Sequence, residues 1–96
     1  MRLTAPQIEI IRSATRDIAG AGASAWLFGS RLDDRRRGGD VDLLIQSPAP
    51  IGLLQRARLK SALEQRLGLP VDVLATTSDD PSSAFVAMVR AQAQRL

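Results

Sequence analysis

The sequence predicts an α+β domain in which a small mixed β-sheet has helices packed on one face. Two stretches repeat apolar residues at the three- to four-residue spacing of an amphipathic helix, and a shorter third stretch near the end does the same. Three other stretches are short, apolar and typical of strands. Glycine and proline separate these stretches, which gives the order helix, strand, strand, helix, strand, helix.

The first helix is predicted over residues 5–19. Thr4 can cap its start, and Pro6 suits its first turn. The run Gly20-Ala21-Gly22 ends it. Its apolar positions are Ile8, Ile11, Ala14 and Ile18.

Two strands and a polar loop follow this helix. Ser24 to Phe28 is a short apolar segment, predicted as a buried strand that ends at Gly29. The polar residues 31–39 are expected to form a loop. Residues 40–46 are predicted as the second strand, because the prolines within 47–50 cannot continue a β-ladder.

The second half begins with a helix from Leu53 that ends at Gly68, with apolar positions at Leu53, Leu54, Ala57, Leu63 and Leu67. Residues 70–75 are predicted as the third strand. The cluster Ser78-Asp79-Asp80-Pro81 then starts a last helix, in which Asp79 and Asp80 are expected to serve as capping groups. That helix would carry Phe85, Val86, Val89 and Ala93.

Length and charge limit what the chain can be. Its 96 residues are expected to form one domain, 1–96. The net charge is only +3, and three aromatic residues are present, all in apolar stretches. Direct nucleic-acid binding is therefore not expected, although the Arg35-Arg36-Arg37 run in the loop could contact phosphates or an acidic partner. A solvated loop is the simpler interpretation of that run.

The chain has no cysteine and no histidine, which removes thiol nucleophiles and the commonest acid-base group and zinc ligand. Carboxylate chemistry remains. No apolar run approaches the roughly 20 residues of a membrane span, and the N-terminus does not resemble a signal peptide. We therefore expect a cytoplasmic protein without membrane contact.

The carboxylates with the most distinctive placement are Asp40, Asp42 and Asp72. Alternation along a strand puts Asp40 and Asp42 on one face, where they could share divalent cations such as Mg²⁺. Asp72 stands in an apolar strand, where a carboxylate is costly unless it is paired, metal-bound or at an open face. On neighbouring strands, the three would form a metal cage.

Each of these features also has a plain structural interpretation. Gly29-Ser30 at the end of a strand could let backbone amides approach a phosphate, but it could equally be a tight turn. Asp40 and Asp42, taken alone, could be turn and capping groups. Trp26 could stack on a base, yet its place in an apolar strand favours packing in the core.

The sequence Phe28-Gly29-Ser30, nine further residues, then Asp40-Val41-Asp42-Leu43 resembles the signature of the minimal nucleotidyltransferase (MNT) family. This family belongs to the DNA polymerase beta superfamily. The family's third carboxylate lies on the strand after the intervening helix, where Asp72 stands, and Arg31 matches a basic residue that often follows Gly-Ser. The resemblance implies the polymerase beta-like nucleotidyltransferase fold.

Two positions depart from the family pattern. Asp34 stands where a second glycine is common, and Gly39 stands where a serine commonly precedes the first aspartate. All three carboxylates are present, so these departures bear on nucleotide affinity more than on metal binding.

The resemblance implies a Mg²⁺-dependent transfer of a nucleotidyl group, AMP from ATP, to an acceptor. Asp40, Asp42 and Asp72 would be catalytic and would hold two Mg²⁺ ions, while Gly29, Ser30 and Arg31 would bind the nucleotide. Minimal members are similar to antitoxins whose partner is a HEPN-type toxin, so such a toxin is the expected acceptor. The alternative is a noncatalytic module that neutralises a toxin by contact alone. The oligomeric state stays open.

Overall fold

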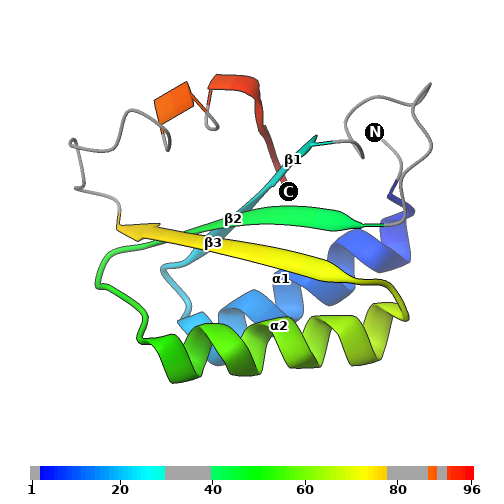
Figure 1. Ribbon diagram of the computed structural model, residues 1–96, viewed down its shortest axis with the longest axis horizontal. Coiled ribbons are helices and arrows are strands. Elements are labelled where there is room, and N and C mark those ends of the chain that lie inside the picture. Colours follow the sequence, from blue (N-terminus) through cyan, green and yellow to red (C-terminus); the bar gives the residue numbers. More distant parts are fainter. Residues whose placement is uncertain (1–2, 30–39, 78–86, 89–90) are drawn as a thin grey trace.

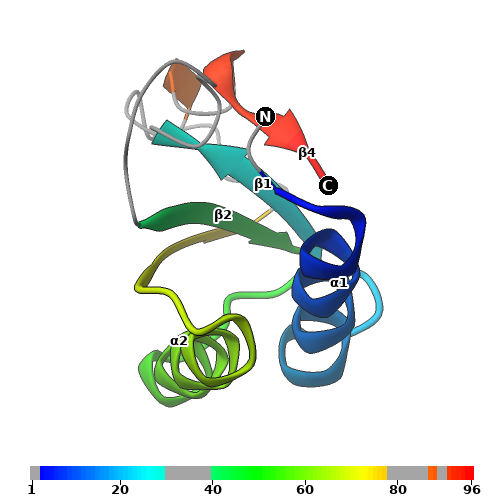
Figure 2. The same ribbon diagram turned by 90° about the vertical axis from the view of Figure 1, so that its right-hand side faces the viewer.

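The structure, a computed structural model, describes residues 3–29, 40–77, 87–88 and 91–96. In this part of the chain, two helices cover one face of a four-stranded sheet (Figures 1 and 2). This arrangement confirms the predicted fold class. The elements are α1 (Ala5–Ala19), β1 (Ser24–Phe28), β2 (Val41–Ser47), α2 (Leu53–Leu67), β3 (Val71–Thr77) and β4 (Gln94–Arg95).

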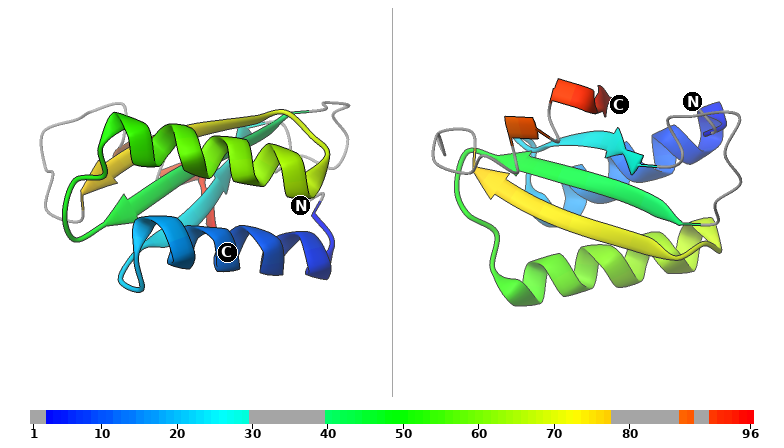
Figure 3. Two further views of the ribbon diagram at one scale, coloured as in Figure 1. Left: turned by 90° about the horizontal axis from the view of Figure 1, so that it is seen from below. Right: turned by 45° about the horizontal axis from the view of Figure 1, so that its top comes forward.

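The strand order is β3-β2-β1-β4. β1 runs antiparallel to both of its neighbours, whereas β2 and β3 are parallel. A parallel pair needs a crossover connection, and α2 provides it beneath the sheet (Figure 3). The sheet is therefore mixed, as predicted.

Local hydrogen bonds fix where both helices begin. The Thr4 hydroxyl oxygen accepts a hydrogen bond from the Gln7 backbone N–H at 3.2 Å, and the Gln7 side chain accepts one from the Thr4 N–H at 2.9 Å. This reciprocal pair is a capping box. At the start of α2, the Gly52 N–H donates to the Gln55 side chain at 3.2 Å.

The core lies between the helices and one face of the sheet. Alternate residues of β1, β2 and β3 point toward the helices, and they meet apolar side chains from α1 and α2. Its fully or almost fully buried members are Ile11, Ala14, Ala25, Leu27, Val41, Leu43, Ile45, Leu59, Leu63 and Val71. The intervening strand residues are consequently left on the face opposite the helices.

The predicted and observed elements differ near the strand ends. β2 begins at Val41 rather than at residue 40, and β3 covers Val71–Thr77 rather than residues 70–75. The short strand β4 was not predicted. Most of the predicted last helix lies outside the described residues, as do the proposed capping groups Asp79 and Asp80, and Ala93 lies between helical backbone at Gln92 and β4.

Both helices are amphipathic and short. α1 and α2 contain 15 residues each, and each buries one stripe of side chains against the sheet. Across the described ranges, no helix has the length and apolar character that spanning a membrane requires.

Candidate active site

Strand pairing brings two of the three predicted carboxylates together. Phe28 of β1 lies opposite Asp42 of β2, and Asp42 lies opposite Asp72 of β3. Since Val41 and Leu43 point into the core, Asp42 and Asp72 share the face away from the helices. Asp40 directly precedes β2 and is exposed. Asp42 therefore belongs to the strand rather than to a turn.

Gly29 packs directly against the carboxylate of Asp42. A Cβ atom at position 29 would lie 2.2 Å from Asp42 Oδ2 and 3.1 Å from Asp42 Cγ. Gly29 also has a φ of +79°, in the left-handed region that side-chain-bearing residues disfavour. Only glycine lets the end of β1 come this close to the carboxylate.

The electrostatics of Asp42 reflect this crowding. Partial burial raises the pKa of the Asp42 carboxyl above its ordinary value, and the negative charges of Asp72 and Asp40 raise it further. A side-chain hydrogen bond with Asp72 acts in the same direction. Like charges in proximity disfavour ionisation. Asp42 is thus the point where the three carboxylates influence one another.

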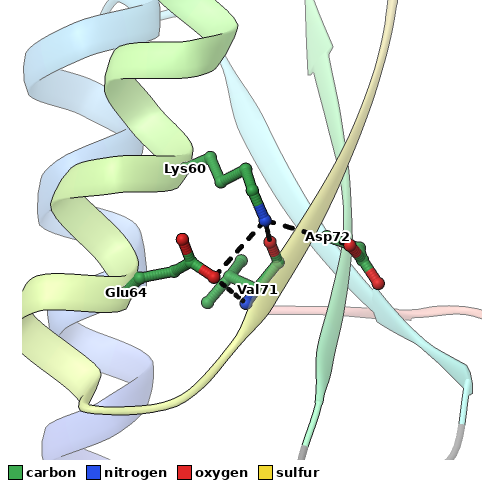
Figure 4. A network of polar contacts seen from close by, with 4 residues as sticks. All are labelled: Lys60, Glu64, Val71 and Asp72. Carbon is green, nitrogen blue, oxygen red and sulfur yellow. Dashed lines mark hydrogen bonds and ion pairs between the residues drawn. The ribbon is translucent and has the colours of Figure 1, made fainter.

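A pair of residues on α2 holds the start of β3 (Figure 4). The Val71 N–H donates to Glu64 Oε2 at 3.0 Å, and Lys60 Nζ donates to the Val71 carbonyl oxygen. Lys60 and Glu64 also pair with each other at 3.3 Å. We call Lys60 and Glu64 the α2 clamp.

The α2 clamp reaches the candidate site as well. Lys60 Nζ lies 3.9 Å from Asp72 Oδ1, although the Asp72 side chain is 69% exposed. The Val71 N–H bond, followed by the influence of Lys60, lowers the pKa of Glu64, and desolvation opposes this shift. Sequence reasoning missed the clamp. Its only sequence signal is the four-residue spacing of a lysine and a glutamate, which indicates a pair on a helix but not its contact with a strand.

The three carboxylates are not gathered into the predicted metal cage. Among the described residues, no group of three or more acidic side chains is gathered as a metal centre. Asp72 is oriented partly toward Lys60, whereas Asp42 lies against Gly29. The metal-binding roles stay predictions. Ser30, Arg31 and the Arg35 to Arg37 run lie outside the described residues.

Trp26 is placed differently from the prediction of core packing. It lies on the sheet face opposite the helices, outside the buried cluster, and is half-buried. Its indole N–H donates to the Ser24 hydroxyl oxygen at 3.3 Å, and the Arg95 guanidinium carbon lies 6.0 Å from the centre of its ring. Arg95 belongs to β4, the strand that the sequence did not predict, and it lies opposite Trp26 in the pairing of β4 with β1.

Comparison with known proteins adds evidence of a different kind. Residues 8–94 match the family model described as Nucleotidyltransferase domain. The chain belongs to this family. The match includes Gly29, Asp40, Asp42 and Asp72, so the nucleotidyltransferase domain contains the whole candidate site.

One curated relative of this nucleotidyltransferase domain is the probable protein adenylyltransferase MntA of Haemophilus influenzae. It is 44% identical over 61 residues, which cover 59% of this chain and 54% of the relative. The matched region thus spans about half the length of that relative.

Solved structures show the same fold. A toxin-antitoxin crystal structure with AMP-PNP matches with a TM-score of 0.71 at 22% identity, covering 97% of this chain and 72% of that chain. The structure of a tri-AMPylated Shewanella oneidensis HEPN toxin in complex with MNT antitoxin matches with a TM-score of 0.66, also at 22% identity. That match covers 93% of this chain and 66% of the other.

Proposed function

We propose that this nucleotidyltransferase domain transfers AMP from ATP to a HEPN-type toxin and thereby acts as an antitoxin in the cytoplasm. The observation that carries the proposal is the pairing of Asp42 with Asp72 on one sheet face, with Gly29 against the Asp42 carboxylate. Family membership and the adenylyltransferase named MntA support the reaction class. The HEPN toxin in the Shewanella oneidensis complex supports the acceptor class.

The donor chemistry of the site fits Mg²⁺. Carboxylate oxygens are the ligands that this hard cation prefers, and Asp42 lies beside the negative charges of Asp72 and Asp40, which a cation would compensate. Asp40, Asp42 and Asp72 would hold the metal, two ions in the proposed form of the site. Bound Mg²⁺ would supply charge stabilisation to the phosphates and lower the pKa of an attacking hydroxyl.

The remaining predicted residues have distinct roles in this proposal. Gly29 brings the backbone at the end of β1 against the Asp42 carboxylate, so this backbone would lie beside phosphates held at Asp42, and Ser30 and Arg31 would add donors to the nucleotide. The chain has no histidine, so proton removal from the acceptor would depend on the carboxylates and the metal.

Nucleotide binding tests the site independently of the acceptor. Calorimetry with ATP and Mg²⁺ should show binding that falls strongly in an Asp40→Asn, Asp42→Asn double variant, because triphosphate charge is then left uncompensated. The control is Asp17→Asn, an exposed aspartate on α1. Equal ATP affinity in the parent and the double variant would refute the assigned site.

Transfer is tested by the intact mass of a purified HEPN-type toxin. With Mg²⁺ and ATP, the parent should add AMP units to the toxin, whereas Asp72→Asn should still bind the toxin and transfer far less. Toxin that gains no mass and is nevertheless silenced by Asp72→Asn would establish the contact-only module instead.

A further inference from the structure

The outer edge of β3 is a second surface with a defined chemistry. β3 is the last strand on its side of the sheet, and it pairs only with β2 among the described elements. The Val41 N–H donates to the Pro70 carbonyl at 2.9 Å, so the backbone groups of Pro70 face β2. Backbone groups alternate along a strand. Those of Val71, Val73, Ala75 and Thr77 therefore face outward.

The α2 clamp closes one end of this edge. Lys60 and Glu64 bond the outward carbonyl and N–H of Val71, the first residue of β3. Figure 4 shows both side chains reaching from α2 to the strand. Charged side chains are a common means of blocking a sheet edge. Among the described residues, these side-chain bonds to the outward backbone groups of β3 are found at Val71 alone.

The other end of the edge is apolar. Leu53 lies seven residues before Lys60 and eleven before Glu64, on the same stripe of α2, yet its exposed fraction is 74%. A hollow of about 340 Å³ lies beside the end of β3, lined by Pro50, Ile51 and residues 75–77. Figure 3 shows α2 running beneath β3, and the bonds of Lys60 and Glu64 to Val71 show that this stripe of the helix lies toward the outer edge of the strand.

Charge selects among the possible occupants of the edge. The stretch Leu53–Leu67 that forms α2 contains four basic residues, Arg56, Arg58, Lys60 and Arg66, against the single acidic residue Glu64. A second copy of this chain that paired through β3 would bring two such helices side by side, and like charges would oppose the contact. An acidic segment would be attracted.

We propose that the outer edge of β3 binds an extended, acidic segment of another protein by β-strand addition. The outward backbone groups of Val73 and Ala75 supply hydrogen bonds to the added strand. One apolar side chain of the segment enters the hollow at Pro50 and Ile51, and its acidic side chains lie over α2. This docking surface goes beyond the proposed transfer reaction and is tested without nucleotide.

The probes are blocked octapeptides with threonine at every second position and, at the positions between, one valine for the hollow and otherwise glutamate, so that valine and glutamate point toward the same side of the sheet. The controls are the same peptides with alternate backbone amides methylated, and peptides with lysine in place of glutamate. Amide hydrogen exchange of the parent is measured with each peptide at millimolar concentration. The valine-glutamate peptide should slow exchange at Val73 and Ala75. The methylated peptide loses strand hydrogen bonds, and the lysine peptide loses charge attraction. Each should bind at least about tenfold more weakly than the valine-glutamate peptide.

Two variants localise the contact. Ala75→Pro removes one outward N–H without removing a bond to β2, and Ala75→Ser is its matched control. Leu53→Glu replaces the exposed apolar side chain with a negative charge and leaves the core untouched, so it keeps the test valid if Ala75→Pro fails to fold. Peptide binding should be lost in Ala75→Pro and weakened in Leu53→Glu, but retained in Ala75→Ser.

Three results would overturn the proposal. They are absence of slowed exchange at Val73 and Ala75 with the valine-glutamate peptide, equal binding of the lysine peptide, and a dimer of the parent in sedimentation that Ala75→Pro dissociates. The last result would assign the edge to a second copy of the chain.

Discussion

Position 29 is constrained twice, once by its backbone angle and once by its neighbour. The φ of +79° costs a side-chain-bearing residue about 1–2 kcal/mol. In addition, a Cβ atom would overlap the Asp42 carboxylate. We expect Gly29→Ala to destabilise the fold by more than the φ cost alone, measured by urea unfolding. Gly52→Ala is the control, because Gly52 has a φ of −72° and nothing within 4 Å of an added Cβ.

The raised pKa of Asp42 predicts that the ionised carboxylate, which the proposed metal site needs, lowers the stability of the folded chain. A folded-state pKa above the ordinary 3.8 means that the folded chain holds this proton more tightly than the unfolded chain. The contribution of Asp42 to stability is therefore greatest below pH 3.8 and falls as pH rises through the folded pKa. Asp42→Asn removes the free-energy cost of ionising this carboxyl in the folded chain.

Without divalent cations, Asp42→Asn should therefore unfold at a higher temperature than the parent at neutral pH, and the gap should close below about pH 3.8. Thermal unfolding in a chelator measures this. A variant that is less stable than the parent at pH 7 would contradict the assigned crowding of Asp42 with Asp40 and Asp72. Added Mg²⁺ should narrow the gap, because the cation stabilises only the parent.

At this scale, the sequence predicted the pairing of Asp42 with Asp72 but not the contacts that support it. The gathering of Asp40 with these two carboxylates around a metal stays a prediction. The clamp from Lys60 to Val71 depends on how α2 lies against β3. That contact joins residues through tertiary packing, which no local pattern reports.

At the scale of elements, the junction of α2 and β3 depends on ionised Glu64. Its pKa is lowered in the folded state, so its contribution is present above the ordinary 4.5 and is lost as pH falls through the folded pKa. Glu64→Gln should lower the unfolding temperature at neutral pH and differ little from the parent in acid. Glu9→Gln, on the exposed side of α1, is the control.

Glu64→Gln and Asp42→Asn should thus shift stability in opposite directions at the same pH. Both variants remove one negative charge, so a change that tracked net charge alone would give the same sign for both. Opposite signs would show that the local partners of each carboxylate decide its effect.

The elements themselves were predictable to different degrees. α1 and β1 have the predicted bounds, because caps and glycines mark their ends. β3 extends two residues further than expected, since Thr76 and Thr77 pair with β2 despite their polar side chains. β4 contains only Gln94 and Arg95, and a two-residue polar strand exists through its pairing with β1 rather than through its own sequence.

For the molecule as a whole, the sheet separates stability from chemistry. Its helix-facing side contains the main buried cluster, whereas the opposite side carries the carboxylates together with one fully buried residue, Leu44. Leu63→Ala removes a fully buried side chain and should lower the free energy of unfolding by about 2–5 kcal/mol. Leu54→Ala, at a position 74% exposed on the same helix, should change it by roughly 0.5 kcal/mol or less. Urea unfolding of both variants measures the difference.

The same separation explains why fold and family could be predicted together from this sequence. Apolar periodicity determines the two-layer packing, and the carboxylate spacing determines the family signature. The two signals occupy alternate positions of the same strand, as Val41, Asp42 and Leu43 illustrate. Ser30 and Arg31 retain only their predicted roles, because they lie outside the described residues.

Lys60 is the only lysine in the chain. An amine-acetylating reagent therefore has a single side-chain target, which lies at the junction of α2, β3 and Asp72. Acetylation would remove the charge that Glu64 and Asp72 share. The rate of labelling measures how strongly the contacts of Lys60 with Glu64, Val71 and Asp72 protect its amine. Mass spectrometry of one tryptic peptide would then follow the state of the junction as cations, nucleotide or a docking peptide are added.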